Sequence, residues 1–272
     1  MADFGKAPDL GFDSRLDLNT VPVELPILFP NDTSLQNATF DFDYVDWSQD
    51  IYVQLYSDNN QSVGLSAELK FYRSSTDQLV GNNEREMIGE EGVYFTGTAF
   101  SKYDSRDDKN FPEKGFYSKL QFRYIHPLTS QFYDDPSEIH SYNLDWSFLR
   151  LFKLTGNFTI GLAGNFGFTS EEATPPYTYF LGGNNQNFIN NFKPFEGLSY
   201  AQEFGSNLMM GSFYGQIRPF KNHFGRLGIS LAMLSDSFDD FTERRAIQSV
   251  SASYGIDTPI GPVELTLSLI HI

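Results

Sequence analysis

The residues with the clearest chemical potential lie in one charged segment, Asp104-Ser105-Arg106-Asp107-Asp108. Carboxylates at alternating positions of a loop are common calcium ligands. An arginine among aspartates can instead form charge-assisted hydrogen bonds that fix the shape of a turn. We favour this structural role, in which Arg106 holds a broad turn between Asp104 and Asp107.

Catalytic groups are sparse elsewhere. A Gly-x-Ser-x-Gly nucleophile turn is absent, and the nearest segment, Gly197-Leu198-Ser199-Tyr200-Ala201, lacks the second glycine. The four histidines, at positions 126, 140, 223 and 271, are scattered and have no metal-ligand spacing. With no cysteine, the chain can form neither disulfides nor thiolate sites. We predict no enzymatic activity, no cofactor and no metal in these residues.

The composition narrows the classes further. The 272 residues include 35 acidic and 19 basic side chains, for a formal charge of −16. This argues against a nucleic-acid binder, which needs basic surface to replace phosphate counterions. No run approaches the roughly 18 apolar residues of a transmembrane helix. The start does not resemble a signal peptide, so we expect a cytosolic protein or a piece of a longer one.

The dominant pattern is alternation with a period of two. In the segment 158–168 the even-numbered residues are apolar or glycine, and the odd-numbered residues are small or polar. Successive side chains of a strand point to opposite faces, so such a strand has one apolar face. Similar alternation recurs at 65–72, 119–124, 226–233, 246–256 and 263–269.

These segments predict an all-β, antiparallel transmembrane barrel. The ten or eleven expected strands are 15–25, 41–57, 63–73, 92–103, 116–126, 142–153, 157–168, 207–219, 225–235, 246–257 and 262–270. The first is the weakest, because Pro22 and Pro26 cannot donate to a strand ladder. Many segments have the length of a tilted transmembrane strand, about 9–11 residues, rather than the 5–6 residues or so of a globular strand.

The connections alternate in length. Tight turns are expected at 57–61, 154–157, 220–224 and 258–262, and long polar loops at 74–91, 127–141, 169–206 and 236–245. Short turns on one side and long loops on the other are typical of outer-membrane barrels. The connection 104–115 is an exception, because it is long but falls on the short side.

Charged and aromatic residues fit the same architecture. The polar strand faces carry Glu68, Lys70, Lys119, Arg123, Arg218, Arg226 and Glu264. A charge facing lipid at mid-bilayer costs about 2–4 kcal/mol, so these faces are expected to line a wet lumen or a polar plug. Aromatic residues gather near strand ends, as in interfacial girdles.

Three segments resemble motifs of the bacterial surface antigen superfamily, whose members are sixteen-stranded outer-membrane barrels that assemble or translocate proteins. The segment from Asp104 to Gly115, which includes Pro112, is similar to a D-x-R-D-x-x-x-x-P-x-x-G turn. Leu181-Gly182-Gly183 is similar to the start of an inward-folding lid loop, and Thr258-Pro259-Ile260-Gly261-Pro262 to a turn before the penultimate strand.

The best match within the superfamily is the barrel that follows a patatin-like phospholipase domain in Bacteroidetes-type proteins. The resemblance implies a bacterial outer-membrane location, the lipid bilayer as a partner, and upstream periplasmic and hydrolase domains in the same protein. The barrel would anchor the attached domain or help it to cross the membrane. Residues 41–272 would form a partial barrel without its last strand, and residues 1–40 one possible strand plus a loop.

The lid tip departs from the family pattern. Its arginine, which reaches an acidic partner in the lumen, is absent from the stretch 190–197, where Lys193 is the available cation. Asp236 stands where the luminal aspartate is expected, so a Lys193–Asp236 pair is one hypothesis and two solvated loop charges are the other.

Two other functions remain open from the sequence. A soluble all-β carbohydrate-binding domain would also be aromatic-rich and acidic, but its apolar strand faces would point inward. A passive porin-like channel would share the strands and loops, but not the three motifs.

Overall fold

The computed structural model describes most of the chain. The described residues are 9–28, 35–80, 84–130, 139–170, 175–183, 191–199, 202–237, 241 and 246–271. Residues 1–8 and 29–34 of the expected N-terminal segment 1–40 lie outside this set, as do Tyr200 and Ala201 of the serine segment.

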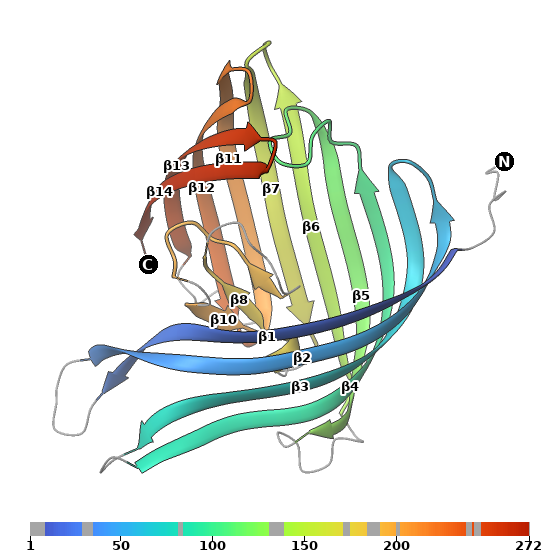
Figure 1. The fold of residues 1–272 in the computed structure, drawn as a ribbon, viewed down its shortest axis with the longest axis vertical. Helices are drawn as coiled ribbons and strands as arrows, with labels where there is room; N and C mark the ends of the chain where they lie inside the picture. The colour runs from blue at the N-terminus through green and yellow to red at the C-terminus, as the bar shows by residue number, and fades with distance from the viewer. Residues whose placement is uncertain are drawn as a thin grey trace.

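One antiparallel sheet of eleven strands dominates the fold, and its order follows the chain (Figure 1). The strands in spatial order are β1 (Asp9–Leu28), β2 (Leu35–Ser57), β3 (Gln61–Val80), β4 (Glu84–Asp104), β5 (Gly115–Ser130), β6 (Ser141–Lys153), β7 (Phe158–Thr169), β11 (Asn207–Phe220), β12 (His223–Ser235), β13 (Ile247–Thr258) and β14 (Gly261–His271). The predicted antiparallel all-β fold and its number of long strands are confirmed.

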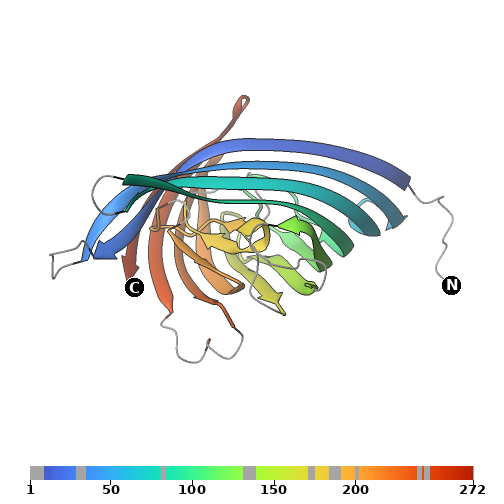
Figure 2. The same ribbon diagram turned by 90° about the horizontal axis from the view of Figure 1, so that it is seen from below.

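The connection between β7 and β11, residues 170–206, is called the lid. It contains a short 3-10 helix, η2 (Pro175–Tyr177), and the strands β8 (Tyr179–Leu181), β9 (Phe192–Lys193) and β10 (Glu203–Gly205). These strands form a separate small sheet in the order β10-β8-β9. Seen from below, the lid lies within the curve of the large sheet (Figure 2).

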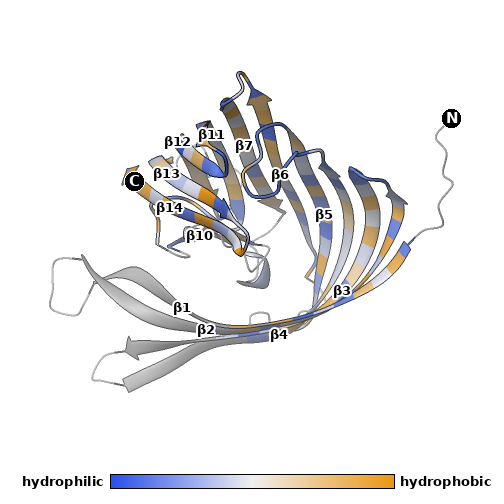
Figure 3. Ribbon diagram, turned by 45° about the horizontal axis from the view of Figure 1, so that its top comes forward, coloured by the Kyte–Doolittle hydropathy of each residue, from blue (hydrophilic) through white to orange (hydrophobic). Residues whose placement is uncertain are grey.

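The two faces of the large sheet differ as the alternation predicted. In Figure 3 hydrophobic and hydrophilic residues alternate along many of the strands. Large apolar side chains are exposed on the outer, convex face, for example Leu65, Leu120, Ile229 and Leu267. Polar side chains are buried on the inner face, for example Thr96, Asn143, Thr159, Gln216 and Ser249. Within the described part of the chain, no helix has the length and apolarity needed to cross a membrane.

The predicted ends of the first four strands were wrong. β1 extends well beyond 15–25, β2 begins at Leu35 rather than at 41, and β3 and β4 extend through most of the expected loop 74–91. The residues of that loop are mostly polar, and the large apolar ones fall in two adjacent pairs, Leu79-Val80 and Met87-Ile88. A period-two criterion therefore does not detect a strand there. Pro22 and Pro26 are accommodated because β1 is an end strand of the sheet order.

The predicted tight turns are confirmed. They join β2 to β3, β6 to β7, β11 to β12 and β13 to β14 at one end of the sheet, called the short-turn end, which is the upper end in Figure 1. Asn222 and Gly261 have positive φ angles of 64° and 127°, which these tight reversals require. The connection 104–115 between β4 and β5 lies at the same end.

An arginine on the outer face tests its lipid contact. Ile229 lies at the middle of β12 and is 53% exposed. Ile229→Arg is expected to lower the free energy of unfolding in lipid vesicles by about 2–4 kcal/mol, because a guanidinium is then held at mid-bilayer. Urea titration of the vesicle-inserted protein measures this loss.

The matched control is Ile260→Arg, at the tip of the β13–β14 turn, where Ile260 is 95% exposed. This change should stay within about 0.5 kcal/mol, as surface substitutions usually do. Equal losses for the two variants would contradict a lipid-facing outer face.

Candidate functional site

The lid turns sharply at the predicted Leu181-Gly182-Gly183 segment. Gly182 and Gly183 have φ angles of 130° and 78°, in a region that L-residues rarely adopt. A Cβ atom on Gly182 would also overlap the carbonyl oxygen of Ser199. The glycines let the chain reverse directly after Leu181, which is completely buried.

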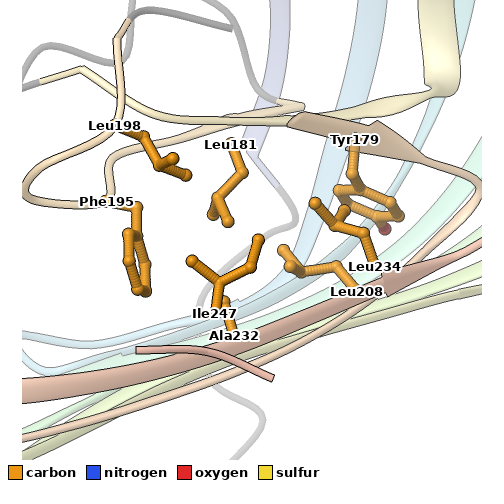
Figure 4. Close-up of a cluster of buried hydrophobic side chains, with 8 residues drawn as sticks. All are labelled: Tyr179, Leu181, Phe195, Leu198, Leu208, Ala232, Leu234 and Ile247. Atoms are coloured by element: carbon orange, nitrogen blue, oxygen red, sulfur yellow. The ribbon is translucent and has the colours of Figure 1, made fainter. Parts of the chain in front are cut away.

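An apolar cluster holds the lid against the inner face of β11, β12 and β13 (Figure 4). The lid contributes Tyr179, Leu181, Phe195 and Leu198, and the wall contributes Leu208, Ala232, Leu234 and Ile247. Burying a large apolar side chain stabilises a fold by about 1.5–3 kcal/mol. This part of the inner face is therefore apolar because the lid covers it.

An ion pair holds the other side of the lid. The Nζ atom of Lys193 in β9 lies 3.2 Å from Oδ2 of Asp145 in β6, and both side chains are less than 10% exposed. The predicted partner was therefore wrong: Asp236 is exposed at the end of β12, whereas Lys193 is buried against β6. Lys193 Nζ also lies 6.0 Å from the ring centroid of Tyr179, within cation–π range.

Asn143, two residues before Asp145, links the lid to the wall. Its Nδ2 donates to the hydroxyl of Tyr179 at 2.9 Å and to Oγ1 of Thr169 at 3.1 Å. Its Oδ1 accepts a hydrogen bond of 2.6 Å from Nη1 of Arg123 on β5. Every polar group of the Asn143 side chain is thus used, which offsets the cost of burying it.

The 3-10 helix reaches the opposite part of the wall. The hydroxyls of Tyr177 and Thr96 on β4 lie 2.5 Å apart. Lys70 on β3 lies 5.5 Å from the ring centroid of Tyr177 and forms a 3.0 Å ion pair with Asp46 on β2. The lid therefore bridges β4 and β6 on one side and β11–β13 on the other.

A polar cavity of about 150 Å³ remains between the lid and strands β1–β6. Its charged lining residues are Asp13, Arg15, Asp46, Asp50, Glu68, Lys70, Arg123 and Asp145. Such a wall suits water or a polar chain segment rather than an apolar ligand. Over the described residues, no group of three or more histidine, aspartate or glutamate side chains is arranged to hold a metal ion.

The Asp104–Gly115 turn has the structural role predicted for it. Arg106 donates from Nε and Nη2 to the two carboxylate oxygens of Asp104, at 2.9 and 2.8 Å. This pairing raises the pKa of the Arg106 guanidinium above its ordinary value. Asp107 was expected to share Arg106, but its Oδ1 instead accepts the backbone N–H groups of Glu113 and Lys114.

The remaining residues of the two turn motifs have roles in backbone geometry and hydrogen bonding. Gly115 has a φ angle of 112°, and a Cβ there would overlap the Ser105 carbonyl oxygen. In the Thr258–Pro262 turn, Oγ1 of Thr258 donates to the Gly261 carbonyl oxygen at 2.5 Å, and the strand ladder resumes at Gly261. Pro112 contributes its carbonyl oxygen to a 3.2 Å hydrogen bond from Nε2 of Gln216.

The sequence matches the family model of the OMP85 superfamily over residues 1–270. The chain belongs to the OMP85 superfamily. Among solved structures it is similar to BamA from Haemophilus ducreyi, crystallised without POTRA domains 1-3, with a TM-score of 0.58 and 14% identity. The similarity covers 85% of this chain but only 51% of that BamA chain, and at this identity it shows the fold alone. Comparison with curated proteins gave no match.

Membership of the OMP85 superfamily confirms the resemblance at the level of the superfamily and of its outer-membrane barrel fold. OMP85-type barrels are a non-enzymatic family, which is consistent with the expectation for these residues.

Sequence reasoning missed most of the residues that hold the lid. Asn143 and Asp145 were only positions within the expected strand 142–153. Tyr179 was only one of the aromatic residues near strand ends, and Tyr177 was not singled out. A signal existed for Asp145, since a carboxylate that a strand directs to its buried inner face needs a partner.

The Lys193–Asp145 pair can be tested by a double-mutant cycle. Lys193→Met is expected to cost about 3–5 kcal/mol, because it leaves a buried carboxylate without its partner. Lys193→Met combined with Asp145→Leu should cost clearly less than the sum of the two single changes. Urea titration of the inserted protein, with protease cleavage of the lid as a second probe, measures each variant.

Asp236→Asn is the matched control for this cycle. Its coupling energy with Lys193→Met is expected to lie within about 0.5 kcal/mol of zero, as for residues without direct contact. A larger coupling to Asp236 than to Asp145 would contradict the observed pairing.

The lid turn can be tested with two glycine substitutions. Gly182→Ala is expected to cost at least about 1–3 kcal/mol through backbone strain, and to expose the lid to protease. Gly97→Ala on β4 is the control, since an added Cβ there meets no atom within 4 Å. Identical protease sensitivity in the two variants would show that the turn is not needed for docking.

Proposed function

We propose that this chain is the barrel domain of a bacterial outer-membrane protein, and that it anchors or translocates a domain attached upstream. The observation that carries this proposal is the apolar outer face of a sheet whose inner face is partly covered by a docked lid. Membership of the OMP85 superfamily supports the outer-membrane location.

The attached domain is proposed to be a patatin-like phospholipase with a periplasmic segment between it and the barrel. Support comes from the sequence resemblance, namely the turn with Asp104 and Arg106, the Leu181–Gly183 segment and the Thr258–Pro262 turn. The described residues supply a fold and a lid but no catalytic group, so a hydrolase activity would belong to the attached domain.

The two rival functions fit the geometry less well. A soluble binding domain would bury its apolar strand face, whereas here Leu265, Leu267 and Leu269 of β14 are 70–78% exposed. A passive porin keeps an open, water-filled interior, whereas the lid occupies the interior and is held there by buried contacts of both polar and apolar type.

Insertion tests the barrel, and fractionation of the full-length protein tests the anchor. The chain should gain its β-type circular dichroism only with detergent or lipid, and its gel mobility should shift on boiling. A folded, monomeric β-protein in plain buffer would contradict the barrel.

For the anchor, lipase activity should fractionate with the outer membrane and become soluble when the barrel is deleted. Absence of lipase activity from a membrane-inserted full-length protein would refute the patatin-like assignment and leave the barrel standing.

A further inference from the structure

We propose that the β4–β5 connection, residues 104–115, is a plug that closes the lumen at the short-turn end, separately from the lid. The other short turns reverse at the rim of the sheet, but this segment contacts β6, β7, β11, β12 and β13. In Figure 1 it is the green segment near the top, beside the β13–β14 hairpin, while the lid lies lower. The proposal rests on the membrane-spanning barrel proposed above.

The plug is stiff enough to act as one body. Besides the Arg106–Asp104 pair, Oδ1 of Asp108 accepts the N–H groups of Asn110 at 2.7 Å and Phe111 at 2.9 Å. Asp107 accepts two further N–H groups from the returning half of the segment. Four of its polar side chains are thus used to fix its own backbone, which lowers the entropy lost on docking.

Glu113 is the anchor of the plug. Its side chain is 9% exposed, and its Oε2 lies 2.7 Å from Nζ of Lys153 on β6 and 3.1 Å from Nη1 of Arg218 on β11. Its carbonyl oxygen accepts a 3.1 Å hydrogen bond from Oγ1 of Thr159 on β7. The carboxylate of Glu113 therefore joins cations on β6 and β11, and its carbonyl oxygen joins β7, which lies between these two strands in the sheet.

Phe111 anchors the far side of the plug. It is 3% exposed and stacks on Phe224 of β12 with ring centroids 4.5 Å apart. Its ring occupies the space where a side chain on Gly255 of β13 would lie. Beside it, Nδ2 of Asn110 donates to Oδ1 of Asp257 at 3.3 Å. The segment thus reaches from β4 and β5 to β13.

The plug and the lid close the lumen at two levels. On β6 the lid binds Asp145 and the plug binds Lys153. Eight residues separate these positions, about 26 Å along a strand at roughly 3.3 Å per residue. If the lid and the plug close the lumen one after the other, removal of either segment should leave the other to block the passage of ions.

The test measures conductance of the full-length protein in planar lipid bilayers. A flexible Gly-Ser linker replaces lid residues 175–203, alone or together with Glu113→Ala. The lid-truncated protein is expected to stay as closed as the natural one, and the combined variant to conduct. Removing the carboxylate ends the Lys153 and Arg218 ion pairs. Because both cations are partly exposed, plug docking should weaken about tenfold or more.

Lys109→Ala in the lid-truncated protein is the matched control, since Lys109 is an exposed residue of the same segment. It should leave conductance unchanged. The proposal is overturned if lid truncation alone conducts as well as the combined variant. Heat-modifiable mobility is checked first, because failure of the natural protein there would contradict the membrane barrel rather than the plug.

A cysteine pair decides the question if the Glu113 variant does not insert. This chain has no cysteine of its own, so Asn110→Cys with Asp257→Cys introduces the only pair within it. A short thiol-specific cross-linker should join the two in membranes without denaturant. Cross-linking seen only after unfolding would overturn the proposal.

Discussion

The constraint on which the whole structure depends is the difference between the two sides of each strand. In a bilayer every backbone polar group must be paired within the sheet, and side chains facing lipid must be apolar. Because the side-chain period is two, most polar residues of a transmembrane strand are then directed to the inner face. The alternation that places apolar side chains against lipid therefore also creates a concave polar surface. The polar side chains on this surface need hydrogen-bond and ion-pair partners that the strands alone do not supply.

The lid supplies partners to the inner face, and the kind of partner differs between its two sides. Over β11–β13 it supplies apolar side chains, and the wall there is apolar as well, with Leu208, Leu234 and Ile247 facing inward. Over β4–β6 it supplies Tyr177, Tyr179 and Lys193 to Thr96, Asn143 and Asp145. The inner face is thus matched to a segment of the same chain, which explains why its polarity is uneven around the curve.

Lysine at the lid tip has a physical consequence. An ammonium is a compact charge without the planar fork of a guanidinium, so it does not form the parallel two-bond pair that arginine forms with a carboxylate. Lys193 meets one oxygen of Asp145, and the face of Tyr179 covers another side of it. The Tyr179 hydroxyl accepts a hydrogen bond from Asn143, which fixes the ring beside Lys193, so the lysine depends on neighbours that fix its surroundings.

The sequence predicted features that depend on local pattern. Alternation identified the strands where the two faces meet different surroundings. It failed at the ends of β3 and β4, because the sequence of residues 74–91 does not alternate. The Arg106–Asp104 pair was predictable because the two residues are two positions apart. The pairing of Lys193 with Asp145 was not, because it depends on how the lid crosses the lumen, and a single sequence does not contain that path.

Glu113 was missed for a related reason. It lies between Pro112 and Lys114 in a segment predicted to be a broad turn fixed by Arg106, and its partners Lys153 and Arg218 are distant in the chain. The length of the connection was the available clue: a twelve-residue segment where its neighbours need only a few must do more than reverse the chain.

The ionic contacts of the lid and of the proposed plug bear on how these two segments are held in place. A buried ion pair contributes little net stability compared with an apolar replacement, because desolvation offsets most of the attraction, but it is costly to break one partner at a time. Lys193–Asp145 and the Glu113 cluster therefore specify position more than they add stability. A closure held in this way has a definite resting position, because any other position would leave a buried charge without its partner.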